Sequence, residues 1–410
     1  MSKALIGTND KDNYLVSPLS ILFPVALTAY GAKGETRQEL VKYLGIADKE
    51  LDLYALKLYA LFDGKSYISI ANMAIVNDTF EMNPEYRSHV KKFGLIENAS
   101  FADKDMIVEK VNTFVSDTTK GNIPTIIGSD DLTDDTQVIL TNALHIKLEW
   151  LNEFDDEPLP GKFYDTLNID TDTDGDCNVD SDVKFVKFLH DDQTTFYFED
   201  DKVQIVSLYM ENMDKFVMIL PKKDHENYVF SEEFTYDLSK CTKEYTRLRF
   251  PVFKMETSMS LVESMKKSGV NLVFDSACSD LTGIFTPVCG DEVLYVSDIL
   301  HKATFDINQK GIEGAAATVA LMMLEGYYAN NSMGPSKLFN ADRPFRYQLL
   351  DHTTNSVMFD GIFHGATTKY HATQEECKWT RDYDEAQVLK YMTDHNARVA
   401  QYSGGNDHSW

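Results

Sequence analysis

The spacing of apolar residues alternates between a helical period and a strand period along the chain, which predicts a mixture of helices and strands. The first element is a short strand leading into a helix, because Ser17 is a good N-cap and Pro18 suits the first helical turn. Apolar residues continue on one face of this helix up to Gly31. Further helices are predicted at 36–44, 51–62, 106–120 and 261–268, and strands at 67–76, 184–190, 194–209 and 215–220. The predicted fold class is therefore α+β with large sheets.

The composition indicates a globular protein with a large core and an acidic surface. Hydrophobic residues make up 43% of the 410 positions, and 65 acidic residues outweigh 39 basic ones, so the formal net charge is −26. Binding to nucleic acid, heparin-like chains or anionic membranes requires a positive face. We therefore expect none of these as partners, and we expect a monomer.

The N-terminus and the cysteines bear on the cellular compartment. The first ten residues contain one cation and no long apolar run, so they predict no conventional signal peptide. The cysteines are odd in number and widely spaced, which argues against a disulfide framework and against a zinc site. They are Cys177, Cys241, Cys278, Cys289 and Cys377. These features predict a cytoplasmic protein, and the alternative is secretion through an uncleaved internal signal.

An acidic segment at 170–182 partly matches a calcium-binding loop. It has oxygen ligands at the first, third and fifth positions and Gly175 at the sixth. Cys177 and Ser181, however, stand where the loop needs an aliphatic residue and a bidentate Glu. A solvated acidic loop is the favoured interpretation and weak calcium binding is the alternative, so we predict no metal site.

The C-terminal extension 367–410 contains a predicted amphipathic helix at 383–402. Asp382 and Glu385 have the spacing of a capping box, and two glycines follow the segment as a stop signal. A narrow apolar stripe runs between them, made of Val388, Met392, His395, Val399 and Tyr402. Docking onto the preceding domain, 1–366, is the favoured interpretation, and docking onto a partner is the alternative.

The sequence contains no recognisable arrangement of nucleophile and base. It has no GxSxG, HExxH, GxxxxGK[ST] or GxGxxG motif, and its ten His residues are scattered. We therefore predict no catalytic residue, no enzyme activity and no cofactor.

The stretch 311–324 is the most informative part of the chain. Alanine propensity alone favours a helix there. At a period of two, however, one face is entirely uncharged, and Glu313 lies on the other face. The uncharged face consists of Ile312, Gly314, Ala316, Thr318, Ala320 and Met322. Such a segment can enter a sheet without burying a charge on that face.

This stretch resembles the hinge of the reactive-centre loop of serpins, the serine protease inhibitor superfamily. The hinge residues are Gly311, Ile312, Glu313, Gly314, Ala315, Ala316, Ala317 and Thr318. Further landmarks of the family recur in the expected order at 17–21, 31–36, 71–72, 118–123, 141–144, 220–221, 281–284, 296–302 and 343–345. The resemblance implies the serpin fold, in which helices surround large mixed sheets, the reactive-centre loop is exposed and the native state is metastable.

The resemblance also implies a mechanism. A serine or papain-like cysteine endopeptidase would cleave the loop 312–338 and become covalently linked to it. Segment 312–324 would then insert into the main sheet and drag the protease across the molecule, so the protein acts as a suicide substrate. By resemblance, Ser17, Ser20, Asn142 and His301 form a buried polar cluster where the sheet opens, and Trp150 lies where the hinge enters.

The bait bond follows from the usual spacing in the family. Fourteen residues past the hinge glycine lies the bond Glu325–Gly326. Glu at this position suits an acid-preferring protease, whereas a papain-like protease would recognise Leu324. Cleavage next to Leu324, Tyr327 or Tyr328 is the alternative, and would suit a chymotrypsin-like pocket.

The chain departs from the family pattern at three places. Ile312 replaces the usual Thr or Ser, the loop's second half at 326–338 is longer than is typical, and the family's long first helix is mostly missing. The alternative function is that of a non-inhibitory serpin, which acts as a carrier, chaperone or storage protein. A bulky charged residue in the inserting face would favour this alternative, and none is present.

Overall fold

The computed structural model describes residues 13–91, 93–133, 135–154, 157–164, 183–231, 233–287, 293–312 and 335–365. The acidic segment 170–182 and the extension 367–410 with its predicted helix 383–402 lie outside these residues. Within the described part of the chain, no helix is both long and apolar enough to cross a membrane.

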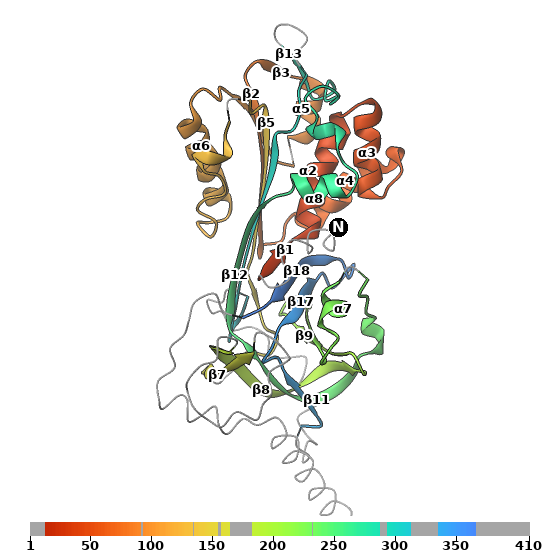
Figure 1. The fold of residues 1–410 in the computed structure, drawn as a ribbon, viewed down its shortest axis with the longest axis vertical. Helices are drawn as coiled ribbons and strands as arrows, with labels where there is room; N and C mark the ends of the chain where they lie inside the picture. Colours follow the sequence, from red (N-terminus) through yellow and green to blue (C-terminus); the bar gives the residue numbers. More distant parts are fainter. Residues whose placement is uncertain are drawn as a thin grey trace, which may run out of the picture.

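Two large β-sheets form the framework of the molecule (Figure 1). In spatial order, the seven-stranded sheet contains β4 (Leu95–Ala99), β2 (Ile68–Asn77), β5 (Val138–Ile146), β14 (Asp298–Asn308), β15 (Gly311–Ile312) and β6 (Leu148–Glu149), and β12 (Phe253–Ser260) also pairs with β14. The nine-stranded sheet contains β1 (Tyr14–Val16), β18 (Val357–Phe363), β17 (Phe345–Leu350), β10 (Lys215–Pro221), β9 (Val203–Tyr209), β8 (Val183–Glu199), β11 (Thr242–Pro251) and β16 (Lys337–Asn340), with β7 (Leu159–Tyr164) paired to β8. Two short strands, β3 (Phe80–Met82) and β13 (Phe285–Pro287), pair separately. The mixture of sheets and helices confirms the predicted α+β class.

Helices cover both faces of the upper part of the seven-stranded sheet (Figure 1). One face is covered by α6 (Lys104–Thr118), whose Ile107, Val111 and Val115 are buried. The helices on the other side of the sheet in this view are α2 (Pro18–Gly31), α3 (Gly34–Leu44), α4 (Leu51–Ala60) and α8 (Val262–Lys267). The remaining described α-helices are α5 (Pro84–Val90) and α7 (Glu226–Phe230).

Local sequence signals explain several of these boundaries. The Ser17 side chain accepts a hydrogen bond from the Ser20 backbone and caps α2, as predicted, and α2 ends at Gly31. Gly45 follows α3 in the left-handed conformation, with φ of 69°, which glycine adopts without steric cost. The prediction of one strand over 194–209 is wrong. The chain turns there because the Asp200 carboxylate accepts hydrogen bonds from the backbone of Lys202 and Val203.

The main hydrophobic core lies between the two sheets. Aromatic rings from both sheets meet in it, and Phe305 of β14 stacks on Tyr347 of β17 with ring centroids 5.6 Å apart. Burial of such rings stabilises the fold through both apolar area and ring geometry. The two sheets also hold the two ends of the segment 313–334: Ile312 belongs to the seven-stranded sheet and β16 to the nine-stranded sheet.

Candidate functional site

The two described hinge residues already occupy the seven-stranded sheet. Gly311 and Ile312 form β15, which pairs with β14 on one side and with β6 on the other. The backbone N–H of Trp150 donates to the carbonyl oxygen of Lys310 at 2.8 Å, which holds the preceding turn against the end of β6. At this end of the sheet, β14 and β6 are therefore separated by one strand.

Only glycine fits at position 311. Its φ is 144°, a conformation that residues with a side chain rarely adopt. A Cβ atom there would also collide with the carbonyl oxygen of Leu148 and lie 2.9 Å from the Trp150 nitrogen. The hinge glycine thus allows the chain to turn directly from β14 into the gap beside β6.

Further along the sheet, the same gap is closed. Strands β5 and β14 pair directly and in parallel, from Ile139 opposite Asp298 to His145 opposite Thr304. A strand that continued β15 along this line would have to separate β5 from β14. We call the stretch where β5 and β14 pair directly, from the end next to β15 to Ile139 opposite Asp298, the β5–β14 boundary.

Four of the predicted site residues meet under this boundary. The hydroxyl of Ser20 donates to Asn142 Oδ1 at 2.8 Å, and His301 Nδ1 lies 2.8 Å from the same oxygen. The Ser17 backbone N–H donates to His301 Nε2 at 3.4 Å. Nε2 is therefore the acceptor nitrogen of the ring, and Nδ1 carries the proton that it donates to Asn142. All four residues are buried, with no measurable exposed area.

Burial also controls the charge of this cluster. It lowers the pKa of His301 to about 3, because the interior disfavours the charged ring more than the bond to Asn142 favours it. The ring is thus neutral at physiological pH, as its acceptor role toward Ser17 requires.

Sequence reasoning missed Asn72 as a member of the cluster. Asn142 Nδ2 donates to the Asn72 side-chain oxygen at 2.7 Å, and Asn72 lies opposite Asn142 in the pairing of β2 with β5. A signal existed, because Asn72 is an amide side chain within the otherwise apolar run 70–76. An amide at such a position needs a partner when it is buried.

Trp150 lies at the end of the β5–β14 boundary next to β15. It is buried, its indole N–H donates to the Asn308 carbonyl at 2.9 Å, and its ring makes edge contacts with Phe216 and Phe250. Since Asn308 ends β14 and Gly311 begins β15, Trp150 contacts the turn from which the hinge starts.

The rest of the predicted site lies outside the described residues. This includes the hinge residues Glu313, Gly314, Ala315, Ala316, Ala317 and Thr318, the bait bond Glu325–Gly326 and its alternatives Leu324, Tyr327 and Tyr328. Their predicted roles stay predictions.

Comparisons with known proteins identify the family. Residues 1–364 match the family model described as Serpin (serine protease inhibitor). Serine protease inhibitor 42Dd of Drosophila melanogaster is 26% identical over 366 residues, which cover 87% of this chain and 92% of that protein. The leukocyte elastase inhibitor of Xenopus laevis is 26% identical over 384 residues, covering 88% and 95%.

Solved structures show the same fold. Serpin48 of the insect Tenebrio molitor superposes with a TM-score of 0.74 at 23% identity, covering 89% of this chain and 94% of that one. A thyroxine-binding globulin in complex with thyroxine superposes with a TM-score of 0.73 at 22% identity, covering 90% and 96%. With a family match over most of its length and the serpin architecture around the hinge, the chain belongs to the serpin family.

Proposed function

We propose that the protein inhibits an endopeptidase as a suicide substrate, by inserting 312–324 between β5 and β14 after cleavage of the loop 312–338. The single observation that carries this proposal is the position of Ile312. It is fully buried between Ile307 of β14 and Leu148 of β6, so the first residue of segment 312–324 already belongs to a strand of the sheet.

The register of β15 supports the proposal. Ile312 faces Ile307 on β14 and Leu148 on β6. If the same antiparallel register continued, Ala316 would lie between Ala303 and Leu144, which now face each other and are both buried. A small side chain would enter this part of the core with little overpacking.

The same register gives Thr318 a specific environment. Two residues further along the inserted strand, Thr318 would lie between His301 and Asn142, which now face each other across the boundary. Insertion would separate these two side chains and break their 2.8 Å bond. The Thr318 hydroxyl can both donate and accept, so it could replace the lost partners. This provides a physical reason for a polar residue at one position of an otherwise apolar and small face.

The two ends of the loop support the requirement for cleavage. Ile312 is held in the seven-stranded sheet, whereas Lys337 begins β16, which pairs in parallel with β11 of the nine-stranded sheet. An intact loop is therefore anchored at both ends. Cleavage at Glu325–Gly326 would free the hinge side without disturbing β16.

A panel of serine and cysteine endopeptidases tests the proposal. The protein is incubated with each protease, complexes are separated by denaturing electrophoresis, and the cleaved bond is located by mass spectrometry. We expect at least one complex that survives boiling in detergent, with cleavage within 324–328. If the loop is cleaved but no protease forms such a complex, and the cleaved protein melts no later than the intact one, the protein is not a trapping inhibitor and the non-inhibitory alternative is favoured.

A further inference from the structure

A groove lies at the edge of the seven-stranded sheet beyond β2, away from the β5–β14 boundary. Its volume is about 1080 Å³, and we call it the edge groove. It is lined by the end of α4 and the loop after it, by the beginning of β2, by the ends of α5 and α6, and by the beginning of β4. Half-buried apolar side chains line it, among them Ile68, Ile70, Leu95, Ile96 and Phe114.

Along this groove, the first half of β2 pairs with no described strand on its outer side, although the Ile68 N–H already donates to the Lys65 carbonyl oxygen at 3.2 Å. Strand β4 pairs only with the second half of β2, from Met73 to Asn77. At Gly94 the chain comes so close to β2 that a Cβ atom would lie 2.8 Å from the Asn72 carbonyl oxygen. Residues 68–71 thus have β5 on one side and no described strand on the other. A free strand edge of this kind can accept a further strand.

Three cations surround this free edge. Arg87 and Lys91 come from the end of α5, and Lys120 follows α6. All three are exposed, and none forms an ion pair with another residue that the structure describes. The two acids that line the groove are already engaged, since Glu97 pairs with Lys110, and Asp63 is hydrogen-bonded to Tyr59. On a chain with a net charge of −26, this is a local reversal of sign.

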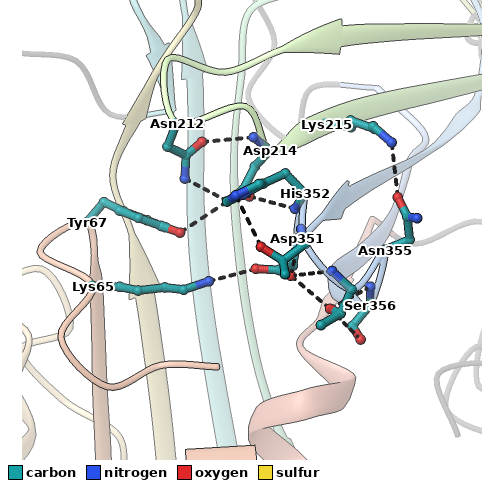
Figure 2. Close-up of polar contacts among 11 residues, drawn as sticks. Lys65, Tyr67, Asn212, Asp214, Lys215, Asp351, His352, Asn355 and Ser356 are labelled. Atoms are coloured by element: carbon teal, nitrogen blue, oxygen red, sulfur yellow. Dashed lines mark hydrogen bonds and ion pairs between the residues drawn. The ribbon is translucent and has the colours of Figure 1, made fainter. Parts of the chain in front are cut away.

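The wall formed by the loop after α4 is fixed in place (Figure 2). Lys65 Nζ lies 2.7 Å from Asp351 Oδ2, and the Tyr67 hydroxyl donates to Asp214 Oδ2 at 3.3 Å. Both aspartates are buried and belong to turns of the nine-stranded sheet; Asp214 also accepts a bond from the His352 backbone at 2.9 Å. Because these bonds hold the loop against the nine-stranded sheet, the groove is preformed, which lowers the cost of binding a ligand.

We propose that the edge groove binds an extended acidic peptide segment of a partner protein, which adds as a strand to residues 68–71 and directs its carboxylates to Arg87, Lys91 and Lys120. Main-chain hydrogen bonds to β2 would supply affinity, and the half-buried apolar side chains would receive alternate residues of the peptide. The three cations would select an acidic sequence and accelerate its association. This inference does not depend on the inhibitory function proposed above.

The test uses a fluorescein-labelled peptide of sequence Glu-Val-Glu-Ile-Glu-Val-Asp and fluorescence anisotropy on the full chain. We expect saturable binding that weakens about tenfold or more in the double variant Arg87→Glu/Lys91→Glu, and that weakens with added salt. The control is Lys254→Glu/Lys267→Glu, which changes the net charge equally at exposed positions outside the groove. The control should bind within about twofold of the unmodified protein.

A second peptide tests strand addition itself. A version with alternate backbone nitrogens methylated keeps every side chain but cannot complete the main-chain bonds, so it should bind at least about tenfold more weakly. Circular dichroism checks that each variant is folded, and Lys120→Glu replaces the double variant if that variant does not fold. The proposal is overturned if the parent peptide does not saturate, if the methylated peptide binds equally well, or if both charge variants lose affinity equally. It is also overturned if the groove binds a fatty acid, tested with laurate, and does not bind the peptide.

Discussion

Burial of the neutral His301 ring should make an identifiable contribution to the loss of stability in acid. The ring is neutral and fully buried, and its Nε2 accepts the Ser17 backbone bond. Protonation would abolish that acceptor and place a charge next to the β5–β14 boundary. In the unfolded chain the ring takes up its proton at an ordinary pKa, whereas burial in the folded protein lowers that pKa to about 3. The unfolded state therefore binds more protons between these two values, and stability falls as the pH drops through this window.

The size of the effect follows from the two pKa values. With an unfolded pKa of about 6.5 and a folded pKa of about 3, lowering the pH to about 4.5 costs about 3 kcal/mol from this residue alone. For a protein of this length, such a loss corresponds to about 3–4 °C in melting temperature. Substitution His301→Gln removes the titrating group, so the variant should lack this part of the acid sensitivity whatever its stability at neutral pH.

The assay is thermal unfolding followed by circular dichroism between about pH 7.5 and pH 4.5. It compares the unmodified protein, His301→Gln, and the control His225→Gln, which removes a half-exposed histidine outside the cluster. The carboxylates contribute equally to the pH dependence of stability in all three proteins, so their effect cancels in the comparison. The control should follow the unmodified protein. The melting temperature of the unmodified protein minus that of His301→Gln should decrease as the pH falls. Parallel pH curves for all three proteins would refute the idea that burial keeps His301 neutral.

Three further predictions concern the inserting face, one buried ion pair and one half-buried ion pair. Substitution Ala316→Arg should leave the loop cleavable but abolish the detergent-stable complex, since an arginine would have to enter the core between the sheets; gel electrophoresis with the target protease checks this, and an undiminished complex would contradict it. Arg346→Met should cost about 3–5 kcal/mol in urea unfolding because it leaves Asp360 charged and buried, and the double variant Arg346→Met/Asp360→Leu should recover most of the loss; a double variant no more stable than the single one would argue against the pair. Lys65→Met should lower stability at pH 7 by about 1–2 kcal/mol, because Lys65 helps to hold the pKa of Asp351 at about 2; the loss should shrink as the pH falls from about 4 toward 2, where Asp351 becomes protonated, and a loss independent of pH would point to packing instead.

Local signals predicted much of the fold. The serine cap and proline at the start of α2 and the glycine after α3 act within a few residues, so they can be identified without knowledge of the tertiary structure. The single predicted strand over 194–209 failed because the β-forming residues on both sides outweighed the charged run 199–202, whose aspartates favour a turn. The turn depends on the Asp200 carboxylate reaching two backbone N–H groups, and no period in the sequence records this contact.

The candidate site was predicted in part, and through resemblance rather than pattern. Ser20 and His301 are far apart in the chain and become neighbours only when β14 pairs with β5, so their separation carries no local signal. Asn72 was missed for the same reason. The cations of the edge groove illustrate the same limit, because Arg87 and Lys120 come together only through the placement of α5 and α6 beside β2.

The turn at Gly311 would make the proposed insertion of 312–324 start at one end of the sheet. Because Ile312 is already paired in the sheet, each following residue would insert next to one that is already paired. Insertion would proceed from the Trp150 end of the β5–β14 boundary toward His301. A substitution near the start of this path would stop the movement while the loop is still mostly outside, whereas one further along would stop it late. Replacing successive positions one at a time should therefore stop insertion after different numbers of residues. The position of the substitution would then set how far an attached protease has moved along the sheet.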